Sequence, residues 1–179
     1  TTLSNVAVGE LVEVLTATKA AADDTYMGGS TKTFTISLIN SGTTPFTGLT
    51  VTDDLGRYTF GAGTLYPLTY AAGSLLYYVN GAQQTAPAVT DTAPLTITGI
   101  TVPAGGNAML VYSTVVNEYA PLGVEDSITN TAVITGDGLM TGVTVTETIN
   151  ASTAPQLAIS KSICPATVVE NGTLTYTLT

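Results

Sequence analysis

The sequence feature that most constrains the fold is a stretch that occurs twice. Residues 15–37, LTATKAAADDTYMGGSTKTFTIS, are restated without a gap by residues 157–179, LAISKSICPATVVENGTLTYTLT. A shift of 142 residues places Lys19 on Lys161 and superimposes two alternating TxTxT patterns. Alternation with a period of two is typical of strands that bury one face. The chain therefore consists of one full unit of strands and the opening of a second.

Composition supports an all-β fold. Charged residues make up only 9% of the 179 residues and hydrophobic residues 44%, and Thr, Gly, Ser and Asn dominate the remainder. This mixture suits pleated strands joined by tight turns better than helices. A chain of this length can bury a core of ordinary size within one domain of about 140 residues.

Further strand patterns follow one another at spacings of roughly ten residues, which is typical of a β-sandwich. Asn80-Gly81, after an apolar run, is the strongest hairpin signal in the chain. We expect about eight or nine strands in a sandwich. The expected elements after the first strand are 31–40, 49–54, a hairpin over 74–86, 95–102, 108–119, 127–135 and 141–149.

The pattern divides the chain into four parts. These are a leading strand segment at 1–14, a β-sandwich repeat at 15–150, a linker at 151–156, and a segment at 157–179 that holds the first strands of a second repeat or strands donated to a neighbour. Incomplete strands would expose apolar faces and unpaired edges. Another unit must therefore complete them, either in a tandem array or by β-strand addition. We expect a head-to-tail row in which residues 151–179 contact another unit.

Charge and residue types exclude several function classes. The formal net charge of −9 disfavours nucleic acid, whose phosphates need clustered Lys and Arg. The chain has no histidine, so the usual general base and the commonest zinc ligand are missing. The paired acids lack the spacing of a calcium loop, and the sequence has no nucleophile motif or phosphate loop. We therefore expect no enzyme activity, no cofactor and no metal. No apolar run in this segment approaches the length of a membrane span.

Three polar residues stand on strand faces that the alternation assigns to the core: Lys19, Asp53 and Asn130. Burying an unpaired ammonium or carboxylate costs several kcal/mol. The set is similar to that of Gram-positive surface domains with intramolecular isopeptide bonds, in which an acid polarises the amide while a neutral amine displaces ammonia. The alternative is that Lys19 extends from a strand end into water, Asp53 caps a turn, and Asn130 hydrogen-bonds to backbone at a Greek-key corner.

Several segments, in their order, resemble a known family. They are TFTISLINSGTTPFTGLTVTDDL, ITVPAGGNAMLVYSTVVN and ITNTAVITG, together with the LAISKS opening and TYTLT. The layout resembles the conserved-repeat family called "domain of unknown function eleven", which occurs in tandem on bacterial and archaeal surface proteins. The resemblance implies an immunoglobulin-like Greek-key sandwich that serves as a structural or adhesive spacer and has no shared activity. The chain departs from it in a long Gly-rich and Tyr-rich insertion between Leu55 and Ala93.

The insertion contains a cluster of tyrosines, which gives stacking area with little entropy cost. The cluster could contact a neighbouring copy, cover the core as a lid, or hold a ligand. Loops on a rigid sandwich often carry recognition, so we expect the insertion, and not the sheets, to carry specificity. The candidate contact residues are Tyr58, Tyr66, Tyr70, Tyr77 and Tyr78.

The preferred prediction is a structural repeat domain of an extracellular stalk or filament, on a cell or spore surface. Its partners are copies of itself or adjacent repeats of the same chain. The alternative is an adhesin-type binding module that uses residues 58–90 to hold a glycan or protein ligand.

Overall fold

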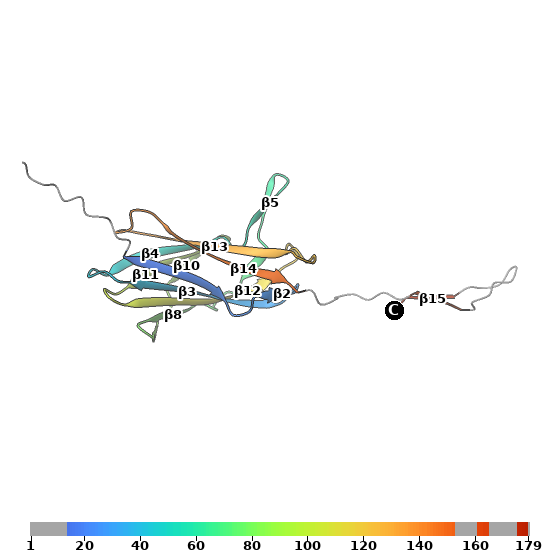
Figure 1. The fold of residues 1–179 in the computed structure, drawn as a ribbon, viewed down its shortest axis with the longest axis horizontal. Helices are drawn as coiled ribbons and strands as arrows, with labels where there is room; N and C mark the ends of the chain where they lie inside the picture. The colour runs from blue at the N-terminus through green and yellow to red at the C-terminus, as the bar shows by residue number, and fades with distance from the viewer. Residues whose placement is uncertain (1–13, 153–160, 165–174, 179) are drawn as a thin grey trace, which may run out of the picture.

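The computed structural model describes residues 14–152, 161–164 and 175–178. Residues 15–151 form a sandwich of two sheets, and the described part of the chain contains strands and turns but no helix. The predicted all-β, immunoglobulin-like sandwich is confirmed (Figure 1). The sandwich extends one residue into the segment that the sequence assigned to the linker.

The first sheet has six strands, all paired antiparallel. Its spatial order is β1 (Leu15–Ala21), β3 (Thr31–Asn40), β12 (Asn107–Val116), β8 (Leu76–Val79) and β9 (Ala82–Gln84), and β7 (Leu68–Tyr70) also pairs with β12. Strand β12 ends three residues before the predicted boundary. The reason is that the Asn117 side chain accepts a hydrogen bond from the Tyr119 backbone and turns the chain.

The second sheet also has six strands. Its spatial order is β10 (Ala88–Thr92), β11 (Leu95–Val102), β4 (Phe46–Asp53), β13 (Ser127–Thr135), β14 (Val143–Ala151) and β2 (Thr25–Tyr26). All neighbours are antiparallel except β14 and β2. The chain changes sheet seven times, and the crossings between long strands are those between β3 and β4, between β11 and β12, and between β12 and β13. These crossings give the sandwich its Greek-key connections.

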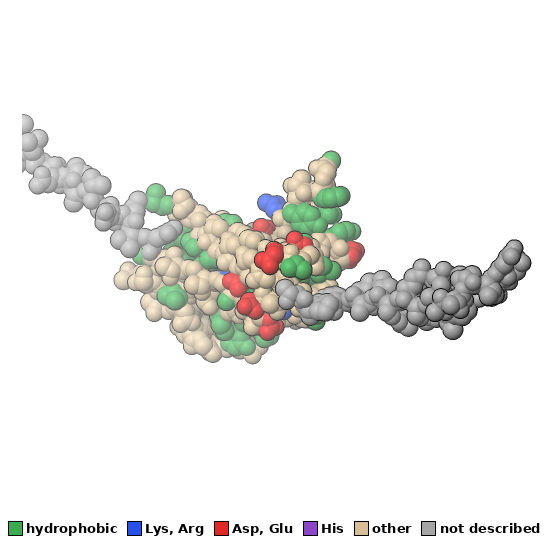
Figure 2. All heavy atoms as spheres, turned by 45° about the vertical axis from the view of Figure 1, so that its right-hand side comes forward, with side chains coloured by type: hydrophobic (Ala, Val, Ile, Leu, Met, Phe, Trp, Pro, Cys, Tyr) green, Lys and Arg blue, Asp and Glu red, His purple; other side chains and the backbone are tan. Residues whose placement is uncertain are grey.

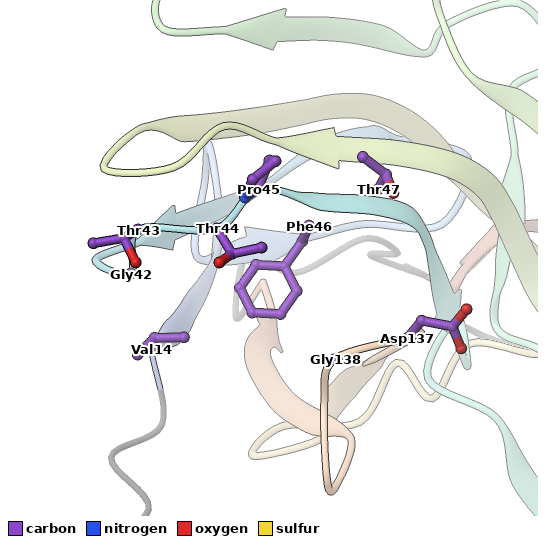
Figure 3. Close-up of a pocket in the computed structure, with 9 residues that line it drawn as sticks. All are labelled: Val14, Gly42, Thr43, Thr44, Pro45, Phe46, Thr47, Asp137 and Gly138. Carbon is purple, nitrogen blue, oxygen red and sulfur yellow. The ribbon is translucent and has the colours of Figure 1, made fainter.

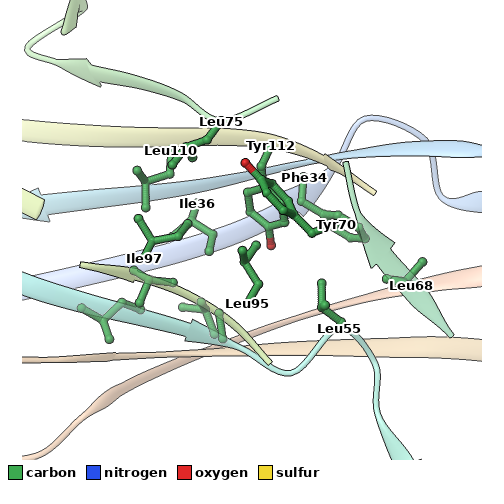
Figure 4. Packing of buried hydrophobic residues seen from close by; sticks show 14 of the residues in the cluster. Phe34, Ile36, Leu55, Leu68, Tyr70, Leu75, Leu95, Ile97, Leu110 and Tyr112 are labelled. Atoms are coloured by element: carbon green, nitrogen blue, oxygen red, sulfur yellow. The ribbon is translucent and has the colours of Figure 1, made fainter. Parts of the chain in front are cut away.

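The core lies between the two sheets, where every second residue of the long strands is buried. Phe34 and Tyr112 stack at its centre, with 5.9 Å between ring centroids (Figure 4). Fully burying one such side chain contributes about 1.5–3 kcal/mol. The alternation in the sequence therefore sets both the strand positions and the face that each strand buries.

The segment between Leu55 and Ala93 does not form one separate insertion. Strands β7, β8, β9 and β10 belong to the two main sheets, whereas β5 (Tyr58–Phe60) and β6 (Gly63–Leu65) form a hairpin that projects from the body (Figure 1). The segment that the sequence analysis described as an insertion therefore supplies strands to both main sheets. The hairpin predicted over 74–86 is confirmed, because Asn80 and Gly81 join β8 to β9 with φ values of 49° and 80°.

The described sandwich has its two chain ends on opposite sides. Strands β1 and β14 run in the same direction along its long axis, so that Val14 lies at one end and Ser152 at the other (Figure 1). We call the end with Val14 the leading end and the end with Ser152 the trailing end. The chain therefore passes through the unit from end to end.

The two strands described after residue 152 pair with each other in the same way as β1 and β3. Strand β15 (Lys161–Cys164) pairs antiparallel with β16 (Thr175–Leu178), and Lys161 lies opposite Leu178. In the pairing of β1 with β3, Lys19 lies opposite Ile36. Both partners are displaced by the same 142 residues, so the register of the two pairs is identical. Residues 1–13 and the remainder of 153–179 lie outside the described residues.

Candidate functional site

Four polar side chains meet inside the core, between the two sheets. Lys19 on β1 and Tyr112 on β12 come from the first sheet, and Asp53 on β4 and Asn130 on β13 come from the second. All four are buried. The prediction that Lys19, Asp53 and Asn130 face the core is confirmed, and Tyr112 joins them.

Lys19 forms a buried ion pair with Asp53. The distance from Lys19 Nζ to Asp53 Oδ2 is 2.5 Å, and both side chains have 0% exposure. The ammonium also lies 5.3 Å from the centre of the Phe34 ring, in the range of a cation–π contact. Burial lowers the pKa of Lys19 below the 10.5 of an exposed lysine, and the Asp53 carboxylate opposes this effect. The alternative in which Lys19 reaches into water is wrong.

The turn after β4 holds Asp53 in place. Asp53 Oδ1 accepts a hydrogen bond of 2.9 Å from the Leu55 backbone, so the predicted turn cap exists alongside the ion pair. Leu55 and Gly56 both have positive φ, 53° and 71°. Positive φ is costly for leucine. At Gly56 a Cβ would lie 2.4 Å from Ile128 Cγ2, so glycine is required there.

Tyr112 was absent from the predicted set. Its hydroxyl donates to Asp53 Oδ2, the same oxygen that faces Lys19. Burial raises the pKa of Tyr112 well above 10.0, and the charge of Asp53 adds to the rise, so the phenol remains a neutral donor. A signal was present in the sequence, because Tyr112 shares the inward face of β12 with Leu110, and a buried tyrosine hydroxyl needs a partner.

Asn130 is the unusual member of the cluster. Neither its Nδ2 nor its Oδ1 has a hydrogen-bond partner within the described part of the chain. The predicted alternative, a hydrogen bond to backbone, is therefore wrong. Another buried asparagine behaves as expected: Asn40 Nδ2 donates to the Thr44 and Pro103 carbonyls at 2.8 and 3.0 Å. Most buried amides resemble Asn40.

Strand register places Asn130 beside the ion pair. Ala132 lies opposite Asp53 in the pairing of β13 with β4, and Asn130 is the next inward residue along β13. The Thr131 backbone donates to Asp54 Oδ1 at 2.9 Å, which fixes the two strands at this point. The Asn130 amide also lowers the pKa of Tyr112, so it lies next to the phenol although it makes no well-formed hydrogen bond.

The five tyrosines of the predicted contact set do not form one surface. Tyr70 and Tyr77 are buried in the core, and the Tyr77 hydroxyl donates to the Thr101 carbonyl at 2.6 Å. Tyr66 and Tyr78 are half-buried, and Tyr58 is exposed on the projecting hairpin. Burial of Tyr70 and Tyr77 removes them from any contact surface and supports the lid interpretation for those two.

Exposed apolar side chains lie on the hairpin that projects sideways from the body and on loops near the trailing end, and we call this set the trailing patch. Figure 2 shows hydrophobic side chains on the projecting hairpin and beneath it, with acidic side chains beside them. Two segments next to patch residues are hydrogen-bonded to the last residues of the sandwich. The Ala151 backbone N–H donates to the Asp126 carbonyl, and the Ser152 backbone N–H donates to the Tyr26 carbonyl. Its exposed members are Met27, Tyr58, Phe60, Tyr119, Leu122 and Val124.

The leading end carries a hollow of about 610 Å³ (Figure 3). It is lined by Val14, residues 42–47, and Asp137 with Gly138. Asp137 is the single ionisable side chain in this lining, so the hollow offers no acid–base or nucleophile pair. Within the described residues, no group of acidic residues or cysteines could hold a metal ion. No helix that could span a membrane occurs in the same part of the chain.

Comparison with known proteins gives matches in structure alone. No protein-family model matches the sequence, and no curated protein matches it significantly. A variant of BcpA, the major pilin subunit of Bacillus cereus, is similar with a TM-score of 0.54 and 14% identity, over 92% of this chain and 52% of that chain. The pilus backbone protein RrgB of Streptococcus pneumoniae gives 0.52 and 15%, over 68% and 31%.

A third similar structure is the N-terminal domain of an adhesin from Streptococcus gordonii, with a TM-score of 0.52 and 11% identity, over 76% of this chain and 32% of that one. The chain thus spans from about a third to about a half of the length of these three structures. At such identities the likeness concerns the fold.

Proposed function

We propose that this chain is a structural repeat domain of an extracellular surface filament or stalk, built from units joined head to tail. The observation that carries the proposal is the repeated register, in which Lys161 lies opposite Leu178 as Lys19 lies opposite Ile36. A second copy of the same opening strand pair begins one unit length along the chain. Repeat proteins are built in this way, with each unit contacting its neighbours.

The two ends of the sandwich are suited to such a row. The chain enters at one end and leaves at the other (Figure 1), so successive units extend the row instead of folding back. The trailing patch presents exposed apolar side chains where the chain leaves, and the hollow at the leading end is lined partly by Val14, Pro45 and Phe46. An unlike pair of surfaces at opposite ends generates an open filament.

The structural comparisons support the location and the partners. Two of the similar proteins are described as a pilus backbone and a major pilin subunit. Because one fold can serve many functions, this likeness supports the proposal only together with the repeated register. We accordingly assign this chain to a cell or spore surface, with further copies or adjacent repeats as its partners. Membership in the "domain of unknown function eleven" family is part of the same proposal, and it rests on the order of the segments that resemble that family.

A chain of four units at the 142-residue spacing tests the proposal. Small-angle scattering and electron microscopy should show a rod whose length grows in proportion to the number of units. A matched chain in which each linker is lengthened with Gly and Ser should be more flexible, because such linkers behave as random coils. Four units that collapse into a compact particle in both chains would contradict the proposal.

A second candidate function is adhesion, and the projecting hairpin favours it. Phe60 on that hairpin is 73% exposed, and an exposed aromatic surface often marks a binding site. Binding of a single unit to glycan or matrix-protein arrays would support adhesion. Loss of that binding on Phe60→Ser, with unchanged circular dichroism, would place the ligand on the hairpin. If a single unit binds none of the arrayed ligands, the result contradicts adhesion, and the filament role is the remaining proposal.

A further inference from the structure

We propose that Lys19 and Asn130 become joined by an intramolecular isopeptide bond, with Asp53 as the acid–base group and Tyr112 as its positioning residue. The bond would link β1 of the first sheet to β13 of the second across the core. The bond would form within a single unit, so it can be tested independently of whether the units assemble into a filament.

The unpartnered amide of Asn130 is the first observation. A buried polar group without a hydrogen bond costs about 1–3 kcal/mol, and here both side-chain atoms of one residue are in that state within the described structure. Asparagine is therefore a poor choice for this position if it only fills space. A covalent role explains why an amide stands there, because its carbonyl carbon is the group that an amine attacks.

The buried ion pair is the second observation. Lys19 and Asp53 have no exposed side-chain surface, and burying two charges is often less stable than burying an apolar pair of the same volume. Moving one proton from Lys19 Nζ to Asp53 Oδ2, across the existing contact of 2.5 Å, produces a neutral amine and a neutral acid. A neutral amine is the nucleophile that the reaction requires.

The reaction balances with the groups present. The Lys19 nitrogen attacks the carbonyl carbon of Asn130, and protonated Asp53 donates its proton to the amide oxygen as the tetrahedral intermediate forms. Asp53 then takes a proton from the attacking nitrogen and delivers it to the leaving nitrogen. As the C–N bond of the Asn130 side chain breaks, the carbonyl reforms and its oxygen returns the proton to Asp53. The new amide bond remains, and one ammonia leaves. No oxidant, reductant or metal takes part.

Tyr112 and the turn after β4 hold Asp53 for both proton transfers. The Leu55 backbone binds Oδ1 at 2.9 Å and the Tyr112 hydroxyl binds Oδ2, so the carboxyl group cannot rotate away from Lys19. The raised pKa of Tyr112 keeps its proton on the phenol while Asp53 changes charge. The cluster is sealed from water by the core around it, which strengthens electrostatic effects inside it.

Intact mass spectrometry of the full chain under denaturing conditions is the test. We expect a mass one ammonia below the sequence mass, and a tryptic map that contains one branched peptide joining Lys19 to Asn130. Trypsin should not cleave after Lys19. A wild-type chain at its full sequence mass overturns the proposal whatever the variants do, so the test does not depend on any variant folding.

Matched variants identify the participating groups. Lys19→Met, Asp53→Ala and Asn130→Ala should each have the full mass expected for the variant sequence. Lys32→Met and Asn40→Ala are the controls, because they alter another buried lysine and another buried asparagine outside the cluster. Both controls should retain the ammonia deficit. A deficit that persists in Lys19→Met overturns the proposal.

One other reaction releases ammonia, so the map must exclude it. Asparagine before glycine can cyclise to a succinimide, and the chain contains Asn80-Gly81 and Asn171-Gly172. Mild alkali hydrolyses a succinimide and adds one water, whereas an isopeptide bond survives that treatment. A deficit that disappears in alkali, or that maps to Asn80 or Asn171, overturns the proposal.

Discussion

Lys19 and Asp53, which stand on facing sheets, bring an amine and a carboxyl oxygen to 2.5 Å in a site sealed from solvent. A pair in this position is weak support for stability in itself, because desolvation offsets much of the attraction. We propose that the pair serves to attack the neighbouring Asn130, whose amide has no hydrogen bond in the described structure. The predictions below follow from this arrangement and from the shape of the unit.

Replacing Asn130 by alanine should destabilise the chain far more than its contacts imply. Its amide makes no hydrogen bond, so truncation in an uncross-linked protein should change the free energy of unfolding little. If the bond closes a loop of about 110 residues, its loss should cost about 4–5 kcal/mol by analogy with a disulfide. Denaturant unfolding of wild type and Asn130→Ala measures the difference. A loss under about 1 kcal/mol would match a side chain without a covalent role.

Alkaline pH should stabilise Asn130→Ala but not the wild type. In the variant Lys19 keeps its amine, and burial lowers its folded-state pKa below 10.5. The unfolded chain then holds more protons as the pH rises toward 10.5, so the free energy of unfolding increases in that range. In the cross-linked wild type the nitrogen is an amide and does not titrate.

The control for this pH effect is the double variant Lys19→Met, Asn130→Ala, which should lack the rise. The two variants have the same residues at every position except Lys19, whose burial lowers its pKa. Guanidinium unfolding at a series of pH values provides the measurement. Parallel curves for the two variants would argue against a buried, titrating Lys19.

Tyr112→Phe should slow formation of the bond while leaving the fold intact. Removing one hydrogen bond to Asp53 should lower the rate about tenfold, which corresponds to about 1.4 kcal/mol, and the pH dependence of the rate should shift. Mass spectra at increasing times after synthesis should reveal a full-mass species that matures slowly. Tyr77→Phe is the control, since its hydroxyl binds the Thr101 carbonyl away from the cluster. Equal rates for the two variants would remove Tyr112 from the mechanism.

Polar substitutions in the trailing patch should make the relative orientation of neighbouring units more variable. Burying Phe60 against the next unit would contribute about 1.5–3 kcal/mol, so Phe60→Ser combined with Leu122→Ser should broaden the distribution of end-to-end distances in a two-unit chain. Small-angle scattering measures that distribution. Leu76→Ser, which alters an exposed leucine on β8, is the control. No change in the double variant would mean that the patch does not face the neighbouring unit.

Alternation in the sequence predicted most of the sandwich, because burial of one strand face leaves a period of two. It also placed Lys19, Asp53 and Asn130 on the inward faces. It could not show that Lys19 and Asp53 touch, since their contact depends on how the two sheets stack. Tyr112 was missed for the same reason: an inward tyrosine resembles any other core residue until the partner of its hydroxyl is known.

The segment between Leu55 and Ala93 was predicted least well. Its strands are three to five residues long, too short for alternation to distinguish a sheet strand from a loop. Its tyrosines look alike in sequence, although Tyr70 and Tyr77 are buried and Tyr58 is exposed. Only pairing with β12, which is distant in the sequence, separates the buried members from the exposed one.

The opposite chain ends of the unit determine how it would respond to mechanical tension. A pull along the row draws Val14 and Ser152 apart, and it loads β1 along its own axis, so all seven of its pairings with β3 resist in shear together. With Lys19 joined to Asn130, force would pass from β1 directly into β13 and leave the chain between them unloaded. The stretch of about 110 residues between Lys19 and Asn130, with a contour length of roughly 370 Å at full extension, would then not extend under force. Each unit would act as an almost inextensible link.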